Sequence, residues 1–290
     1  MESKIHNHPS ARQKAVLVTG CSSGIGLAIA VRLAREGFIV FSTVRKEGDA
    51  ERLGNFKESN IIPIYPLDLS TLDHIPRVFE AVSAEINRRG LPGLHALINN
   101  AGGGFIAPIE AMDMEKFRTE LTARVIGATA LVQAFLPSIR RARGRLVWIM
   151  TPATIPTSFV SSIHACDFAI NCIVRTLALE LAPWNIPIVM IRCGGIKTPA
   201  GMRTREDVES LLQSGSDRVE HYKERVTAWA RSMTKFDGKR TEPEKVANLI
   251  CKVLRARTPR SRYSVGHMAK FAGFLECLPQ VLADRLLKMV

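Results

Sequence analysis

Apolar runs and helical patterns alternate regularly along this chain. Six runs rich in β-branched residues predict buried strands at residues 15–19, 38–42, 61–67, 96–100, 146–150 and 186–191. Apolar positions at helical spacing predict helices near 25–36, 72–89, 113–142, 162–182 and 243–256, followed by a last strand at 263–265. Strands that are apolar on both faces are typical of parallel sheets covered by helices on both sides. The pattern therefore predicts a single doubly wound α/β domain over residues 15–265.

Three segments fall outside this rhythm. Residues 199–240 are polar and helix-prone, and an insertion there would lie above the carboxyl ends of the strands, where ligands bind in doubly wound sheets. We expect this segment to be a helical substrate lid. Residues 1–14 are polar and are expected to form a disordered tail. Residues 266–290 are apolar, are interrupted by Pro279, and are expected to form a C-terminal helical extension that packs on the domain or contacts a membrane surface.

Composition narrows the possible functions. The 290 residues, 46% hydrophobic and 23% charged, suit one domain with a sizeable core. The six cysteines form no C-x-x-C or Cys/His cluster, so we expect no metal and no disulfide framework, and free thiols favour the cytoplasm. No apolar run approaches the roughly 18 residues of a membrane span. The net charge is +13, but the basic runs are short and lack interleaved aromatics, so nucleic acid is not an expected partner.

A glycine-rich loop joins the first strand to the first helix. Glycines let the backbone turn tightly and approach a pyrophosphate, and the helix N-terminus supplies N–H donors and positive potential. The loop is therefore a candidate cofactor site, with contacts expected from Thr19, Gly20, Ser22, Ser23, Gly24, Ile25 and Gly26.

In its TGxxxGxG form, this loop resembles that of the short-chain dehydrogenase/reductase family. Asp68 in PLDLS ends the third strand, residues 99–102 read NNAG, and Cys193 begins a CGGIKT sequence similar to the family's PGxxxT motif. The segment RSRYSVG resembles the last strand of the retinol- and hydroxysteroid-type members. The resemblance covers about residues 15–198 and implies a Rossmann-type dinucleotide fold that forms homo- or hetero-oligomers with other family subunits. It also implies cofactor contacts from Asp68, Asn100, Gly194, Ile196 and Thr198.

The end of the second strand bears on the choice between the two nicotinamide cofactors. Proteins of this fold that prefer NAD place an acidic residue there to bind the ribose hydroxyls. Here the position carries Arg45 and Lys46, which suit a 2′-phosphate. We therefore expect NADP(H) as the cofactor.

The catalytic residues that the resemblance implies are largely replaced. Family members reduce carbonyls with a Tyr acid, a Lys four residues later, a Ser and an Asn. The aligned positions hold Ile163, Asp167 and Arg124, and the serine position falls on Thr151 counted from the strand or on Met150 counted back from Ile163. Since isoleucine has no proton to give, ordinary ketone reduction should be weak.

Two of these replacements carry opposite charges. We expect Arg124 and Asp167 to face each other in the cleft, and we take Arg124, Asp167 and Thr151 as the candidate catalytic residues. The alternative is that Asp167 is a solvated helix charge, or that the pair only ties two helices together.

Three functions from different classes follow. The first is an NADPH-dependent reductase of a substrate that needs hydride without a proton, such as an iminium ion in secondary metabolism. The second is a non-redox cyclase or isomerase on the same scaffold. The third is a cofactor-binding pseudoenzyme that partners an active homologue.

Overall fold

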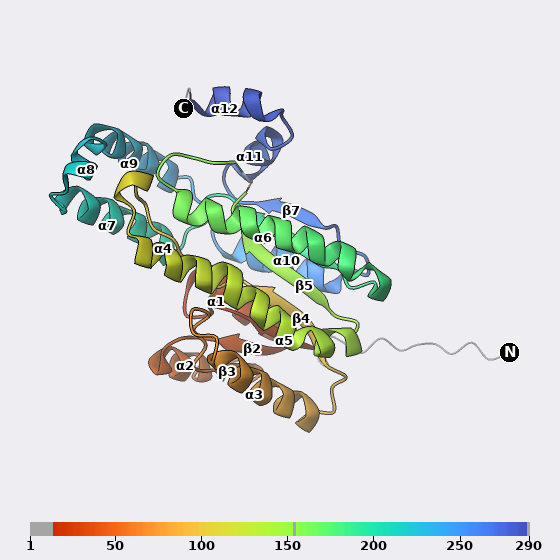
Figure 1. The fold of residues 1–290 in the computed structure, drawn as a ribbon. Helices are drawn as coiled ribbons and strands as arrows, with labels where there is room; N and C mark the ends of the chain where they lie inside the picture. The colour runs from red at the N-terminus through yellow and green to blue at the C-terminus, as the bar shows by residue number, and fades with distance from the viewer. Residues whose placement is uncertain (1–13, 153–154, 289–290) are drawn as a thin grey trace.

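A computed structural model describes residues 14–152 and 155–288, without the side chains of 200–205 and 288 (Figure 1). The tail expected at residues 1–14 lies outside the described residues except for Lys14.

One parallel sheet organises the molecule. Its strands occur in the spatial order β3-β2-β1-β4-β5-β6-β7, and every neighbouring pair is parallel. Their bounds are β1 (Ala15–Val18), β2 (Ile39–Thr43), β3 (Ile61–Ile64), β4 (Leu94–Asn99), β5 (Arg145–Met150), β6 (Ile188–Cys193) and β7 (Arg262–Val265). The order reverses between β1 and β4, which places the expected cofactor loops at this switch point. The predicted doubly wound fold is confirmed, with strand ends displaced by a few residues.

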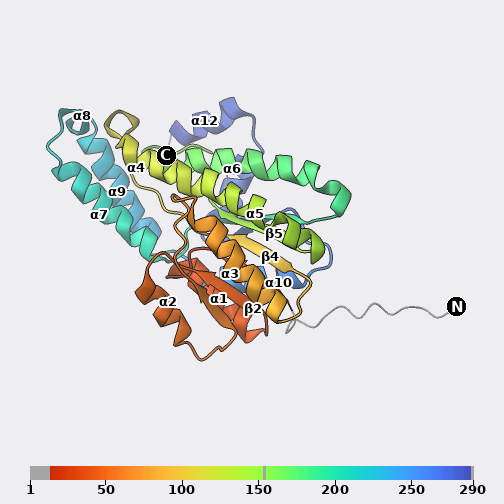
Figure 2. The same ribbon diagram turned by 60° about the horizontal axis from the view of Figure 1, so that its bottom comes forward.

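Helices cover both faces of the sheet (Figures 1 and 2). Side chains that alternate along each strand feed two separate cores: Leu17 and Leu97 point into one, and Val16 and Ile98 into the other. The first core is closed by α3 (His74–Arg88), α5 (Ala128–Arg141) and α6 (Ser161–Glu180), and the second by α1 (Gly24–Arg35) and α10 (Glu244–Arg255). A short polar helix, α2 (Glu47–Gly54), was not predicted from the sequence.

The helix predicted at 113–142 is interrupted by a wider turn. It consists of α4 (Met114–Leu121), a π-helical segment η3 (Thr122–Gly127) and α5. The segment ends at Gly127, where a β-carbon would lie 2.0 Å from the carbonyl oxygen of Leu69. Glycine therefore lets this helix approach the loop after β3, and the π turn, a feature often found at functional sites, carries Arg124.

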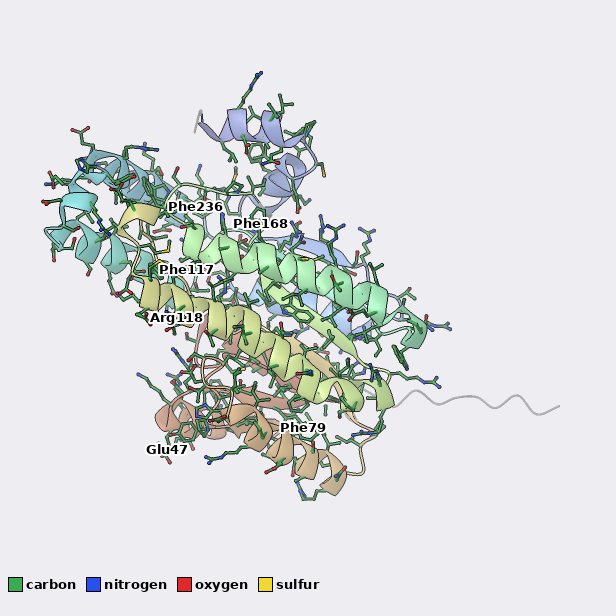
Figure 3. The ribbon with its side chains drawn as sticks, in the orientation of Figure 1. Glu47, Phe79, Phe117, Arg118, Phe168 and Phe236 are labelled. Atoms are coloured by element: carbon green, nitrogen blue, oxygen red, sulfur yellow. The ribbon has the colours of Figure 1, made fainter. Side chains whose placement is uncertain are left out.

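Three helices follow β6 where the lid was expected: α7 (Pro199–Gln213), α8 (Asp217–Glu220) and α9 (Lys223–Asp237). Val208 and Val226 bury against Ile106 from the loop after β4. Phe236 of α9 packs so closely on Gly195 that a β-carbon there would lie 2.7 Å from its ring (Figure 3). These helices thus cover the loops that follow β4 and β6, while their role as a lid remains a prediction.

The C-terminal residues form α11 (Ala269–Leu275) and α12 (Gln280–Lys288), at the top of Figure 1. A buried arginine connects them to the sheet: Arg192 of β6 is fully buried and pairs with Glu276 and with Asn171 of α6. Two single turns, η2 (Ile109–Ala111) and η4 (Ala182–Trp184), complete the described elements.

Among the described residues, two helical segments are long and apolar enough to cross a membrane by length and composition alone, although neither is an uninterrupted apolar run. They are Met114–Arg141 and Ser161–Glu180, with mean hydropathies of 1.3 and 1.2. Both cover the sheet and contribute to its core, and core helices of soluble proteins commonly pass the same test.

Candidate functional site

The glycine-rich loop is held in place by the residues behind it. Thr19 is buried, and its hydroxyl oxygen accepts hydrogen bonds from the backbone N–H groups of Asn100 and Ala101, both at 2.9 Å. A β-carbon at Gly26 would lie 2.2 Å from the carbonyl oxygen of Gly20. Gly20 itself has a φ of +71°, a left-handed conformation that favours glycine. The loop can therefore turn sharply and present the N-terminus of α1 to a ligand.

A cavity of about 490 Å³ opens in front of this loop. It runs from the end of β2, past the ends of β3 and β4, to the start of α7. The predicted cofactor residues that line it are Gly20, Ser22, Ser23, Gly24, Ile25, Arg45, Asp68, Asn100 and Thr198. Thr19, Gly26, Gly194 and Ile196 do not line it, and of these Thr19 and Ile196 are buried.

Asp68 lies on one wall of the cavity. Burial raises its pKa, but the N–H and the hydroxyl of Ser70 donate to its carboxylate at 2.9 and 2.6 Å and outweigh that effect, so that the pKa falls below its usual value. The carboxylate is thereby fixed in an ionised, oriented state, which suits an acceptor of hydrogen bonds from a base.

Arg45 and Lys46 lie at one end of the cavity, where both are exposed. Asp49 also lines this end, but its carboxylate is engaged by Arg52 at 2.9 Å. The end that would receive the adenosine ribose is thus rich in cations. Gly26 also allows the glycine-rich loop to pack closely against the start of α1. The cations and this loop together fit an anionic dinucleotide.

The structure brings Arg124 and Asp167 together as the sequence predicts. A guanidinium nitrogen (Nη2) of Arg124 lies 2.6 Å from Oδ1 of Asp167, and the two side chains are only 11% and 3% exposed. Nη1 of Arg124 also donates to the carbonyl oxygen of Ile163 at 3.2 Å. The pair therefore joins η3 to α6 in a nearly dry environment.

Thr151, one of the two candidates for the serine position, directly follows β5. Its backbone N–H donates to Oδ2 of Asp167 at 3.0 Å, whereas Met150 points into the hydrophobic core. Thr151 therefore lies beside the Arg124–Asp167 pair, and its assignment to the serine position stays a prediction. Both carboxylate oxygens of Asp167 are thus occupied by protein donors, which favours a role in holding the site together over direct contact with a substrate.

Three consecutive glycines after β4, Gly102 to Gly104, allow three side chains to pack tightly against the same loop. A β-carbon would lie 3.0 Å from Arg124 Nε at Gly102, 3.0 Å from Glu120 Oε1 at Gly103, and 2.1 Å from Ile163 Cγ1 at Gly104. Ile163, which the sequence predicts at the family's tyrosine position, therefore packs directly on Gly104, whose φ is +132°. Glu120, which lines the cavity, was missed from the sequence, although its place one helical turn before Arg124 is a usable signal.

Tyr222 is the tyrosine that the sequence left open as a substitute acid. It precedes α9, packs edge-on against Phe159 with ring centroids 6.5 Å apart, and donates a hydrogen bond to Glu110 at 2.9 Å. Its hydroxyl is thus engaged on the outside of the α7–α9 segment.

The family profile described as short chain dehydrogenase matches residues 14–209, which is more than half of the chain. The chain belongs to the short-chain dehydrogenase family. It falls in the retinol/hydroxysteroid branch that the last-strand motif suggested. Members of this family are commonly oligomeric and act on small molecules. The matches confirm the oxidoreductase family that the sequence motifs predicted.

Three similar proteins show the breadth of the family. Homo sapiens 17-beta-hydroxysteroid dehydrogenase type 1 is 32% identical over 253 residues, covering 86% of this chain and 76% of that protein. The 3-amino-tetrahydro-pyrrolizinone reductase of Xenorhabdus hominickii is 29% identical over 262 residues, covering 89% and 88%. The structure of L-sorbose reductase from Gluconobacter frateurii, complexed with NADPH and L-sorbose, matches with a TM-score of 0.69 and 25% identity, covering 87% and 94%.

Proposed function

We propose that this short-chain dehydrogenase is an NADP(H)-dependent reductase whose substrate accepts a hydride without needing a proton from the protein, such as an iminium ion. When bound, NADPH supplies the hydride. The observation that carries the proposal is at position 163, where an isoleucine packed on Gly104 replaces the proton-donating tyrosine while the dinucleotide loop keeps its geometry.

Cofactor binding is supported by the cations at one end of the cavity. We expect NADPH to bind at least about tenfold more tightly than NADH, because Arg45 and Lys46 can pair with a 2′-phosphate. Arg45→Asp should narrow that gap in a calorimetric titration. Arg35→Asp, a change of the same charge on the exposed surface of α1, is the control and should leave the ratio unchanged. Equal affinities of the wild type for both cofactors would contradict the assignment.

The substrate class follows from charge. An iminium carbon already carries the electron deficiency that an acid must create at a ketone, so hydride addition gives a neutral amine with no proton needed. Asp167 stabilises the site as part of a neutral buried pair rather than as a free counter-ion, because Arg124 and the Thr151 N–H occupy its oxygens. The similarity to a pyrrolizinone reductase adds support, since that protein's name describes the reduction of a nitrogen heterocycle.

The proposal is tested by measuring NADPH oxidation with three compounds that share a five-membered ring: a cyclic N-methyl iminium salt, the parent cyclic imine and cyclopentanone. We expect the N-methyl iminium salt to be reduced at least about 100-fold faster than cyclopentanone. The absence of a general acid slows only the ketone, because only the ketone oxygen must receive a proton. At saturating NADPH, the rate with the parent imine should fall as the pH rises and the imine loses its proton, whereas the rate with the methylated salt should not change with pH. Fast ketone turnover with an inert iminium salt would contradict the proposal.

A cofactor-binding subunit without activity of its own is the second candidate. It is favoured by the cavity itself, whose lining reaches Gly104 but does not include Ile163, Asp167 or Thr151. In that case none of the three rings would be turned over, although NADPH would bind.

The partner surface that we propose is the outer stripe of α6. Phe168 (Figure 3), Cys172, Arg175 and Leu179 are exposed and recur at spacings that place them on one helix face. Leu179 is 79% exposed and Phe168 43%, so two large apolar side chains of this face lie open to solvent. A second subunit of the same family would cover this face of α6.

All six cysteines are free, in keeping with a cytoplasmic site of action.

A further inference from the structure

Glu120 is a carboxylate that the proposed reaction does not use, and it lies inside the cofactor cavity. It belongs to the last turn of α4 and lines, beside Thr119 and Ala123, the same cavity as the dinucleotide loop. A β-carbon added at Gly103 would lie 3.0 Å from Oε1 of Glu120, so the Glu120 side chain packs directly against the loop after β4. A carboxylate in this place faces the path of an anionic dinucleotide.

The surroundings of Glu120 are only partly favourable to its charge. Burial raises its pKa above the usual value, and the charge of Arg124, the amides of Gly103 and Gly104, and the charge of Arg45 only partly offset this. Arg124 is already committed to Asp167 at 2.6 Å. Arg45 is expected to pair with the cofactor's phosphate once it binds, which would withdraw its support from Glu120.

We propose that Glu120 takes up a proton when the cofactor binds, and so makes cofactor affinity depend on pH. This inference rests on the proposed NADP(H) binding and extends it. The phosphates bring negative charge to the cavity and displace its water, and both effects oppose an ionised carboxylate at Glu120. Protonation removes the repulsion and turns the side chain into a hydrogen-bond donor. The affinity should therefore be greatest at low pH and fall as the pH rises, since the bound state holds one proton more than the free state.

Other groups near the cavity titrate or carry charge, and they define the control. Asp68 after β3 and Asp207 of α7 line the same cavity, and Arg45 and Arg124 face Glu120 from the end of β2 and from η3. The cofactor's own 2′-phosphate titrates near pH 6 and acts in the opposite direction, because its fully charged form pairs better with Arg45. Comparing the wild type with Glu120→Gln cancels these shared contributions.

Calorimetric titration with NADP⁺ between pH 5.5 and 8, in buffer pairs that differ in ionisation enthalpy, tests the inference. The wild type should take up more protons than Glu120→Gln, by a difference that approaches one proton where the site titrates. The ratio of variant to wild-type affinity should grow by up to about tenfold per pH unit across that window. Glu115→Gln, an exposed carboxylate of the same helix, is the matched control and should behave as the wild type.

Equal proton uptake and equal pH slopes for the wild type and Glu120→Gln would overturn the inference while leaving the cofactor site intact. No binding of NADP⁺ by the wild type at any pH would overturn the proposed function, and this inference with it.

Discussion

Asp167→Ala should lower the free energy of unfolding by about 3–5 kcal/mol, because it leaves the Arg124 guanidinium buried without its partner. The carboxylate is 3% exposed and binds both Arg124 and the Thr151 N–H, so its loss also releases two donors. For a chain of this size, that change corresponds to a fall in the midpoint of thermal unfolding of roughly 5–8 °C. Thermal and urea unfolding of the two proteins measure it.

The double variant Arg124→Asn with Asp167→Ala should recover part of that loss, because no buried charge then remains unmatched. The control is Glu115→Ala, which breaks an exposed Glu115–Arg118 pair and should cost less than about 0.5 kcal/mol. The pair does not hold the site together if the free energy of unfolding of Asp167→Ala lies within about 0.5 kcal/mol of the wild-type value. The same follows if the double variant is less stable than Asp167→Ala.

Gly26→Ala should reduce cofactor affinity by at least about 100-fold, an effect of roughly 2.7 kcal/mol. The added β-carbon would lie 2.2 Å from the Gly20 carbonyl oxygen and 2.6 Å from Nδ2 of Asn100. Neither is the free end of a flexible chain, since Asn100 is itself hydrogen-bonded to the backbone of Thr19. The dinucleotide loop must therefore move away from α1. Titration with NADPH, followed by fluorescence, gives the affinity directly.

Gly54→Ala is the matched control for that variant. Gly54 ends α2, and its nearest neighbour would be 3.9 Å from the new β-carbon. Alanine favours the helix over glycine by up to about 1 kcal/mol, so the control should be neutral or slightly stabilised and should bind NADPH normally. Wild-type affinity in Gly26→Ala would show that the cofactor does not use this loop.

Much of the fold follows from the sequence because buried parallel strands and their connecting helices carry strong local patterns. The features that did not follow depend on contacts distant in sequence. The π turn at Thr122–Gly127 exists where Gly127 meets the Leu69 carbonyl, and no local pattern of apolar residues records that contact. Likewise α2 is short and polar, with only Leu53 buried, so it has no apolar periodicity to detect.

The site was predictable where motifs fix the backbone and less so where side chains meet. Opposite charges at positions 124 and 167 suggested an ion pair, because the resemblance implies that the family residues at these two positions are near neighbours. The sequence could not show that Thr151 occupies the remaining oxygen of Asp167, which depends on where β5 ends. Nor could it show that Glu120 turns inward, since glutamates on helices are usually solvated.

Transfer of deuterium from NADPH labelled at C4 of the nicotinamide tests the central claim most directly. After incubation with the N-methyl iminium salt, the account predicts deuterium on the former iminium carbon of the amine, detected by mass spectrometry, and at least about 100-fold less labelled alcohol when cyclopentanone is offered instead. A labelled alcohol with an unlabelled, unreduced iminium salt would contradict it.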